Sequence, residues 1–334
     1  MKTFIFASSF LSCLLGAVGL TQTATFADQN PVASSPSAGL TSFNPQMLPL
    51  YASSESASAP SASTAAGPYG LFNLLDSRSE FGTGFFPEPF LVDEGDRDKE
   101  VALSWYHQEG PGSGTNQITG DVEWTFWGTT IEVEVPWESD TFPSTDPFTS
   151  QPDTQRTSGV DAIQIALRHP IWQYVSSDNN IDNTLVAAFE MAVPTNSPVG
   201  KDTELVPEIF DLLRLGDHLG IQTHVGYSTL LGPDPSDKET LEYSLDVSYT
   251  IDDSIVPLPQ DLLGILPIFE LAGYRGLNNG DLSDNLSGVI GARFNLAPIG
   301  TASPRLGIGY VFPVDKQASS TFRWGMITSI VFDL

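Results

Sequence analysis

One short stretch constrains the fold more than any other part of this 334-residue chain. Residues 241–251 read LEYSLDVSYTI, in which apolar and polar side chains alternate without a break. Successive side chains of a β-strand point to opposite faces, so this stretch, as a strand, has one apolar and one polar face. A half-buried strand of a soluble protein shows the same pattern. The choice between a strand of a soluble protein and a strand of a transmembrane β-barrel therefore depends on how often the alternation recurs.

The same alternation recurs along the chain from residue 99 to the end, and it marks twelve strands in all. The segment 204–215 is the least regular and is assigned as a strand by position more than by pattern. Amphipathic helices and continuous apolar core strands are missing beside these segments. Strands of roughly nine to eleven residues cross a bilayer at a tilt. We predict an all-β fold, a twelve-stranded antiparallel transmembrane β-barrel of the outer-membrane type.

The connections sort into two kinds when they are counted along the predicted barrel. An even strand number places both ends of the barrel on the periplasmic side, so odd-numbered connections face outside. The longest connection, 138–158, is one of these outer loops, whereas the tight turns at 128–129 and 216–217 lie inside. Short inner turns and longer outer loops are typical of outer-membrane barrels.

The first residues have the features of a secretory signal peptide. Lys2 precedes the apolar run 4–20, and small residues follow, so we expect residues 1–27 to be removed after Ala27. Cleavage before Cys13, as in a lipoprotein, is the weaker alternative because it leaves a very short apolar core. Cys13 is the only cysteine in the sequence, so the mature chain would have no disulfide and no thiolate metal site.

The next segment, 28–85, is rich in Ser, Ala and Pro. Such a composition buries too little apolar surface to offset its ordering entropy, so we predict a disordered periplasmic extension. A partner-binding tail is the alternative interpretation. The barrel then occupies 86–334, and the sequence leaves open whether residues 28–98 plug its lumen.

The charge of the chain is strongly negative, at −27, although only 16% of the residues are charged. This charge argues against nucleic acid as a partner. Several carboxylates on the predicted inner faces would be costly in a dry core but are acceptable in a water-filled lumen. The residues expected to face the lumen and line a solute path are Glu123, Glu132, Glu134, Arg168, Glu190, His224, Glu242, Asp246, Glu270, Arg293, Arg305 and Arg323.

Catalytic and cofactor motifs are not convincing in this sequence. The four histidines form no tight metal-ligand spacing. His224 and Ser228 share a strand face, but both would point inward and no orienting third residue is apparent. We therefore predict that the chain is not an enzyme and that it has no catalytic residues, no cofactor and no metal site.

Two short motifs resemble a known family. A strand ending in Val193-Pro194-Thr195, followed by a strand carrying Gly226-Tyr227, is similar to outer-membrane meta-pathway phenol-degradation proteins. Residues 86–94, FPEPFLVDE, have the same character, and the resemblance spans about 85–334. Asn196 stands where that family often has Gly. The resemblance implies a transporter of aromatic or other hydrophobic compounds and supplies no catalytic residues.

These observations predict an outer-membrane channel or transporter for small solutes, hydrophobic or aromatic ones among them, through a narrow polar lumen. The expected partners are outer-membrane lipid, the solute and, during biogenesis, the barrel-assembly machinery. The last is implied because the C-terminal strand is similar to the assembly signal of such barrels, although Asp333 and Leu334 follow the aromatic Phe332. A structural or surface-binding barrel with an occluded lumen and a soluble secreted β-sandwich binding protein are the alternatives.

Overall fold

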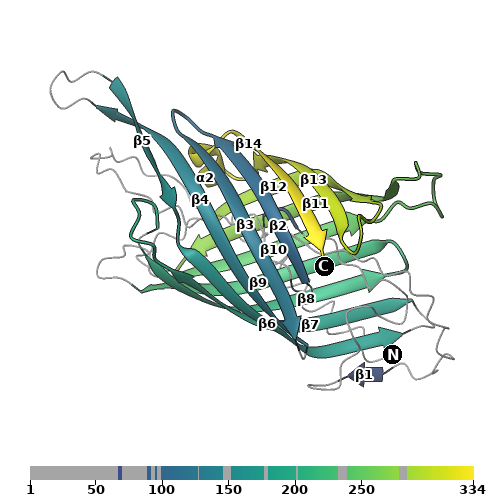
Figure 1. Ribbon diagram of the computed structural model, residues 1–334. Coiled ribbons are helices and arrows are strands. Elements are labelled where there is room, and N and C mark those ends of the chain that lie inside the picture. Colours follow the sequence, from purple (N-terminus) through teal and green to yellow (C-terminus); the bar gives the residue numbers. More distant parts are fainter. Residues whose placement is uncertain are drawn as a thin grey trace, which may run out of the picture. The chain divides into compact units, whose positions relative to one another are not determined.

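The structure of the protein is a computed structural model, and the residues that it describes are all β except for one short helix (Figure 1). The predicted signal peptide and most of the predicted extension lie outside the residues that it describes. The described residues are 67–69, 89–91, 95, 99–126, 128–145, 152–176, 180–200, 202–231, 239–277 and 284–334.

The strands follow one another along the sheet almost in chain order. Within the described residues, no helix is long and apolar enough to cross a membrane. The elements are β1 (Gly67–Tyr69), β2 (Lys99–Glu109), β3 (Gly114–Phe126), β4 (Thr129–Thr145), β5 (Pro152–Val160), β6 (Ile163–Ser176), β7 (Ile181–Val193), β8 (Thr203–Leu215), β9 (Leu219–Leu231), β10 (Glu239–Tyr249), β11 (Leu262–Gly276), β12 (Asp284–Leu296), β13 (Ser303–Pro313), α2 (Lys316–Thr321) and β14 (Trp324–Asp333).

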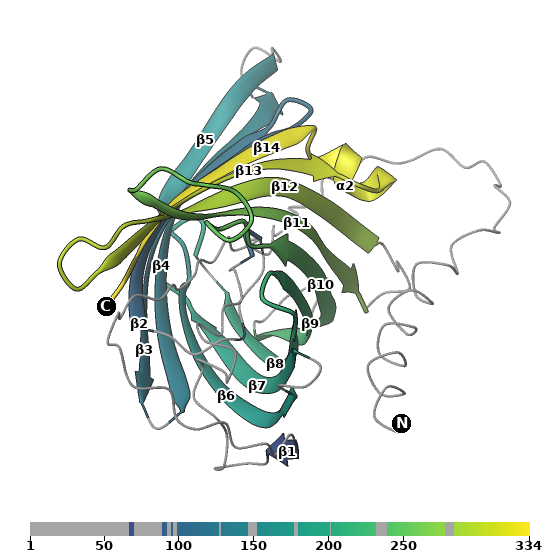
Figure 2. The same ribbon diagram turned by 90° about the vertical axis from the view of Figure 1, so that its right-hand side faces the viewer.

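The sheet closes on itself (Figure 2). The last strand, β14, pairs antiparallel with β2, from Trp324 opposite Glu109 to Asp333 opposite Glu100. A further pairing joins β4 to β6. Of the fourteen strands in the sheet, β1 and β5 lie outside the ring that these two pairings complete, so twelve strands form the barrel. The predicted twelve-stranded antiparallel barrel is confirmed.

The two strands β5 and β6 behave as one strand interrupted by a bulge. Both pair antiparallel with β4, and the register shifts by one residue between them, at Asp161 and Ala162. Pro136 of β4 stands opposite this point, and its carbonyl accepts from the Asp161 N–H at 2.9 Å. Proline has no N–H to give to the ladder, so a bulge is where a sheet tolerates it.

The predicted outer loop 138–158 is therefore mostly strand, which corrects the sequence-based assignment. Residues 138–145 extend β4, and residues 152–158 belong to β5. The hairpin carries polar residues on both faces there, so the apolar alternation that marks a strand stops before the strand itself does. A second difference is β1, because three residues of the segment predicted to be disordered pair with Gln173–Val175 of β6.

The irregular segment 204–215 is a full strand, β8. Its inner face carries charged residues, Glu208 and Arg214, beside apolar Phe210 and Leu212, and all four are buried. The mixture of charged and apolar residues on one face is what obscured the alternation in the sequence.

Polarity across the barrel wall is the reverse of that in a soluble protein. Large apolar side chains are exposed on the outer face, among them Leu103 (53%), Trp124 (53%) and Ile290 (60%). Charged side chains between them in sequence, such as Glu123 and Arg293, are buried on the inner face. A wall that is apolar outside and charged inside suits lipid, and it does not fit the soluble β-sandwich alternative.

Candidate functional site: the barrel interior

A run of carboxylates covers the inner face of three neighbouring strands. Direct cross-strand partners include Glu100 with Glu123, Glu123 with Glu132, and Asp121 with Glu134. Like charges directly opposite each other destabilise a sheet, so this arrangement costs stability. We call this set the acidic wall; its buried members are Glu100, Asp121, Glu123, Glu132, Glu134 and Glu138.

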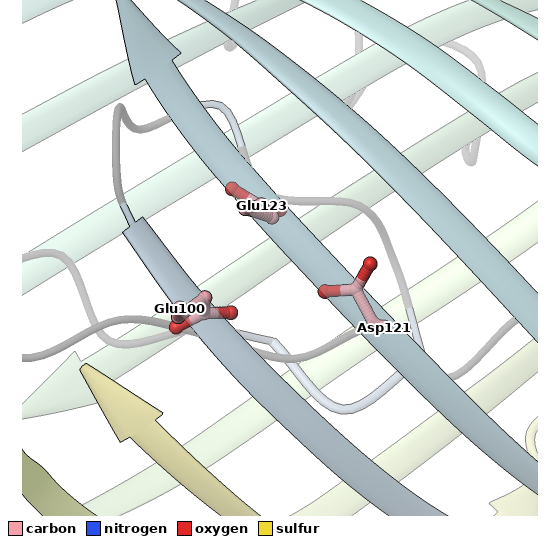
Figure 3. Close-up of side chains that lie close together, drawn as sticks. All are labelled: Glu100, Asp121 and Glu123. Carbon is pink, nitrogen blue, oxygen red and sulfur yellow. The ribbon is translucent and has the colours of Figure 1, made fainter. Parts of the chain in front are cut away.

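Three members of the acidic wall come especially close together (Figure 3). One carboxylate oxygen from each of Glu100, Asp121 and Glu123 lies within 4.8 Å of the others. All three side chains are at most 3% exposed. Three buried carboxylates so close together concentrate negative charge, and their burial strengthens the local attraction for cations.

Arg168 of β6 offsets part of this charge. Its guanidinium lies 2.6 Å from the Glu123 carboxylate and also pairs with Glu132, and all three side chains are 1% exposed. The arginine reaches these partners from the neighbouring strand, because β6 pairs with β4 at Thr130–Glu134. Three of the sequence-predicted lumen residues thus form one buried ion-pair cluster.

A second charged group lies on β10, β11 and β12. Asp246 and Glu270 are direct cross-strand partners, and neither is exposed at all. Arg293, from β12, is 1% exposed and donates to the Ser329 hydroxyl at 3.2 Å. Asp246, Glu270 and Arg293 were all predicted to face the lumen, and the structure places all three on the inner face.

Part of the chain that precedes the barrel lies inside it. Residues Pro89–Leu91, here called the inner segment, belong to no strand. The Glu270 carboxylate accepts from two successive backbone N–H groups, those of Phe90 and of Leu91, the latter at 2.9 Å. Arg293 donates to the Pro89 carbonyl at 2.9 Å. The inner segment is therefore held by both signs of charge.

The Phe90 ring fills a space that three glycines leave open. A Cβ atom added at Gly291, Gly307 or Gly309 would lie 2.4, 2.9 or 3.4 Å from an atom of this ring. The Arg293 guanidinium carbon lies 4.5 Å from the ring centroid, within the range of a cation–π contact. We call this space the Phe90 slot. The Phe90 side chain belongs to a buried apolar cluster with Ile268, Val289 and Ile327.

The other predicted lumen residues are placed as follows. Glu190 is 8% exposed, and Glu242 is half-buried on the same face as Asp246. Arg305 is buried and pairs with Asp333. Arg323 differs from the expectation, because it lies just before β14 and is exposed, while its neighbour Phe322 is buried. Helix α2 ends there, and the strand alternation begins only at Trp324.

His224 has a partner that sequence reasoning missed. Its Nε2 lies 3.1 Å from the Glu208 carboxylate, and its ring stacks on Phe210 with the centroids 4.8 Å apart. The Ser228 hydroxyl donates to Glu204 rather than to His224. The arrangement therefore offers no Ser–His pair in which the histidine could activate the hydroxyl.

The alternation in the sequence could have identified two further inward-facing residues. Glu100 and Asp121 share the parity of residues already assigned to the inner faces of their strands, so counting along the alternation finds them. The inner segment had no such signal, because its partner Glu270 lies 180 positions away from Phe90.

The geometry defines a class of protein. A closed antiparallel ring leaves no unpaired strand edge facing lipid, and its outer face is apolar while its interior is charged. The chain is a β-barrel of the outer membrane of a Gram-negative-type bacterium, porin-like in architecture.

Comparisons with known proteins find similar folds but no close relative. No protein-family model matches the chain, and no curated protein does. Among solved structures, an outer membrane channel from Pseudomonas putida F1 is similar at 12% identity, with a TM-score of 0.47, over 72% of this chain and 98% of that one.

Two porins are similar at lower scores. The NanC porin has 10% identity and a TM-score of 0.40, over 70% of this chain and 98% of that one. The KdgM porin, solved with disordered oligogalacturonate, has 9% identity and a TM-score of 0.39, over 70% and 99%. Likeness at this level transfers no function to the chain.

Proposed function

We propose that the chain is an outer-membrane channel for small solutes, with the charged inner face of the barrel as the route. The observation that carries this proposal is the placement of ionisable side chains inside a closed barrel whose outer face is apolar. Charged groups are costly inside a membrane protein unless they are paired or line an aqueous path. A structural barrel can be stabilised with an apolar interior and does not require an acidic wall.

The acidic wall gives the route a sign. It gathers six buried carboxylates, Glu100 to Glu138, on three neighbouring strands, and Arg168 pairs with two of them. A confined space lined by one sign of charge concentrates counter-ions and repels ions of the same sign. We therefore expect cations and neutral solutes to pass more readily than anions. The hydrophobic or aromatic solutes implied by the family resemblance remain part of this proposal.

A structural or surface-binding barrel with an occluded lumen is the second candidate. One observation favours it, namely the inner segment held between Glu270 and Arg293. Twelve strands also enclose a narrower lumen than the sixteen to eighteen of general porins, so inward side chains fill more of it. No catalytic role is proposed, because His224 and Ser228 are engaged with separate carboxylates.

Liposome swelling separates the two candidates. The full chain reconstituted in vesicles should admit small uncharged solutes, such as arabinose, and a glycine-sized zwitterion faster than protein-free vesicles do. Folded protein is verified beforehand by the gel shift between unboiled and boiled samples. No swelling above the protein-free rate, with a folded barrel, would favour the occluded barrel and reject the channel.

A further inference from the structure

The Phe90 slot has the construction of a binding site for a flat ring. Gly291 and Gly309 are direct cross-strand partners on β12 and β13, and Gly307 is the partner of Arg293. Glycine inside a strand weakens it and often marks a place where another group approaches closely. Because the three glycines around the ring lack a Cβ atom, they leave room for the ring against the barrel wall.

The polar groups around the slot specify what should flank the ring. The Glu270 carboxylate accepts N–H donors on one side, and the Arg293 guanidinium donates to a carbonyl on the other. Arg293 also covers the face of the ring. The carbonyl of Pro89 and the N–H of Phe90 belong to the same peptide bond, and the N–H of Leu91 belongs to the next one. A solute that reproduces these contacts therefore has an acyl carbonyl before its aromatic residue and an amide N–H on either side of it. Hydrogen bonds to the charged groups of Glu270 and Arg293 are stronger than those between neutral groups.

The occupant of the slot can leave without disturbing the barrel. Pro89–Leu91 form no ladder pair with any strand, so every strand pairing of the ring survives their departure. Among the described residues, the inner segment is held by the side chains of Glu270 and Arg293 and by the apolar packing around Phe90. A solute with the same three features can make the same contacts.

We propose that the Phe90 slot binds small solutes in which an aromatic residue follows an acyl carbonyl and has an amide N–H on either side. N-acylated aromatic amino-acid amides and short peptides with an aromatic residue are the solutes of this class. Phe90 occupies the slot as an internal substitute and competes with them. The proposal deepens the proposed channel function by naming a solute class, but the binding itself does not depend on conduction.

Binding of a labelled probe to the full chain in detergent tests the proposal. The probe is N-acetyl-L-phenylalanine amide, and equilibrium dialysis against empty micelles gives its affinity. A tethered ring competes at an effective concentration in the millimolar range, so removing it should raise the apparent affinity. We expect Phe90→Ala to bind the probe about tenfold or more tightly than the unmodified chain.

Specificity is tested with three further probes. L-Phenylalanine lacks the acyl carbonyl and the second amide N–H, so it should bind Phe90→Ala more weakly than the amide does, whereas N-acetyl-L-alanine amide should not bind measurably. Adding Arg293→Met to Phe90→Ala should weaken binding of the phenylalanine amide about tenfold, the loss of one charge-assisted contact. Benzyl alcohol lacks the flanking carbonyl and should be affected much less. Free phenylalanine that binds as tightly as the amide would contradict the proposal.

Matched variants control for folding. Phe142→Ala removes an exposed phenylalanine from the outer part of β4 and should leave probe binding as in the unmodified chain. Gly307→Ala in the Phe90→Ala chain narrows the slot and should abolish binding. If Phe90→Ala loses its heat-dependent gel shift, Phe90→Leu replaces it.

The proposal is overturned if folded Phe90→Ala binds the phenylalanine probe no more tightly than the unmodified chain, or binds the alanine probe equally well. Probe binding without any vesicle permeability would support the binding slot and reject the channel. Vesicle permeability without probe binding would support the channel and reject the binding slot.

Discussion

Replacing Arg168 with methionine should destabilise the barrel strongly, although methionine fits a similar space. The guanidinium neutralises two carboxylates, Glu123 at 2.6 Å and Glu132, and all three side chains are 1% exposed. Removing one partner of a buried ion pair leaves an uncompensated charge and costs about 3–5 kcal/mol. Here two carboxylates lose the same partner, so we expect a value in the upper part of that range.

Urea unfolding in lipid vesicles, followed by tryptophan fluorescence, measures this cost. Arg156→Met is the matched control, because Arg156 is exposed on β5 and donates to the Ser139 hydroxyl at 2.7 Å. Its loss should cost about 1 kcal/mol or less. Replacing Glu123 and Glu132 with glutamine in the Arg168→Met chain removes the uncompensated charges and should recover most of the lost stability.

The reasoning is refuted if Arg168→Met unfolds at the same urea concentration as the unmodified chain. It is also refuted if the added glutamines destabilise the Arg168→Met chain further, since the cost would then not come from unpaired carboxylates. Either result would mean that water, rather than the arginine, solvates the acidic wall.

Three further outcomes follow from the same structure. Gly291→Ala should cost about 1–3 kcal/mol of unfolding free energy by overpacking, and less in a Phe90→Ala background, because the atom nearest to the new Cβ belongs to the Phe90 ring, at 2.4 Å. Equal costs in the two backgrounds, measured by a double-mutant cycle, would contradict the slot. The Ser254 hydroxyl, the Ser254 N–H and the charge of His218 hold the pKa of Asp252 below 3.8. The unmodified protein should therefore be more stable than Asp252→Asn above pH 3.8, and this difference should disappear as the pH falls through the folded-state pKa. A stability difference that persists in acid would contradict this reasoning. Replacing Glu132 and Glu134 with glutamine should lower the permeability ratio of K⁺ to Cl⁻ measured from reversal potentials, and an unchanged ratio would remove the acidic wall from the route.

The number of barrel strands could be predicted because lipid imposes a strict rule on the outer face. Segments such as 241–251 keep an apolar residue at every second position, and the barrel strands were found from this rule except for 204–215, which was assigned by its position between two others. The rule does not apply to the β4–β5 hairpin, which carries polar residues on both faces. For that reason, residues 138–145 were assigned to a loop although they continue β4.

The interior could be predicted only as far as the alternation reaches. It placed Glu132, Asp246 and Arg293 on the inner face, but it could not say that Arg168 meets two carboxylates from different strands. Such contacts depend on register across the barrel. The alternation failed at Arg323, where α2 interrupts the chain before β14. The position of the inner segment could not be predicted either, because the segment follows no strand pattern.

Single-channel recording in planar bilayers tests the channel proposal most directly. Purified full chain, verified as folded by its heat-dependent gel shift, should produce discrete conductance steps, with reversal potentials that show a preference for cations. Phe90→Ala should open more often or conduct more, because it empties part of the interior. Silence from both folded proteins would contradict the channel and leave the occluded barrel as the account of this chain.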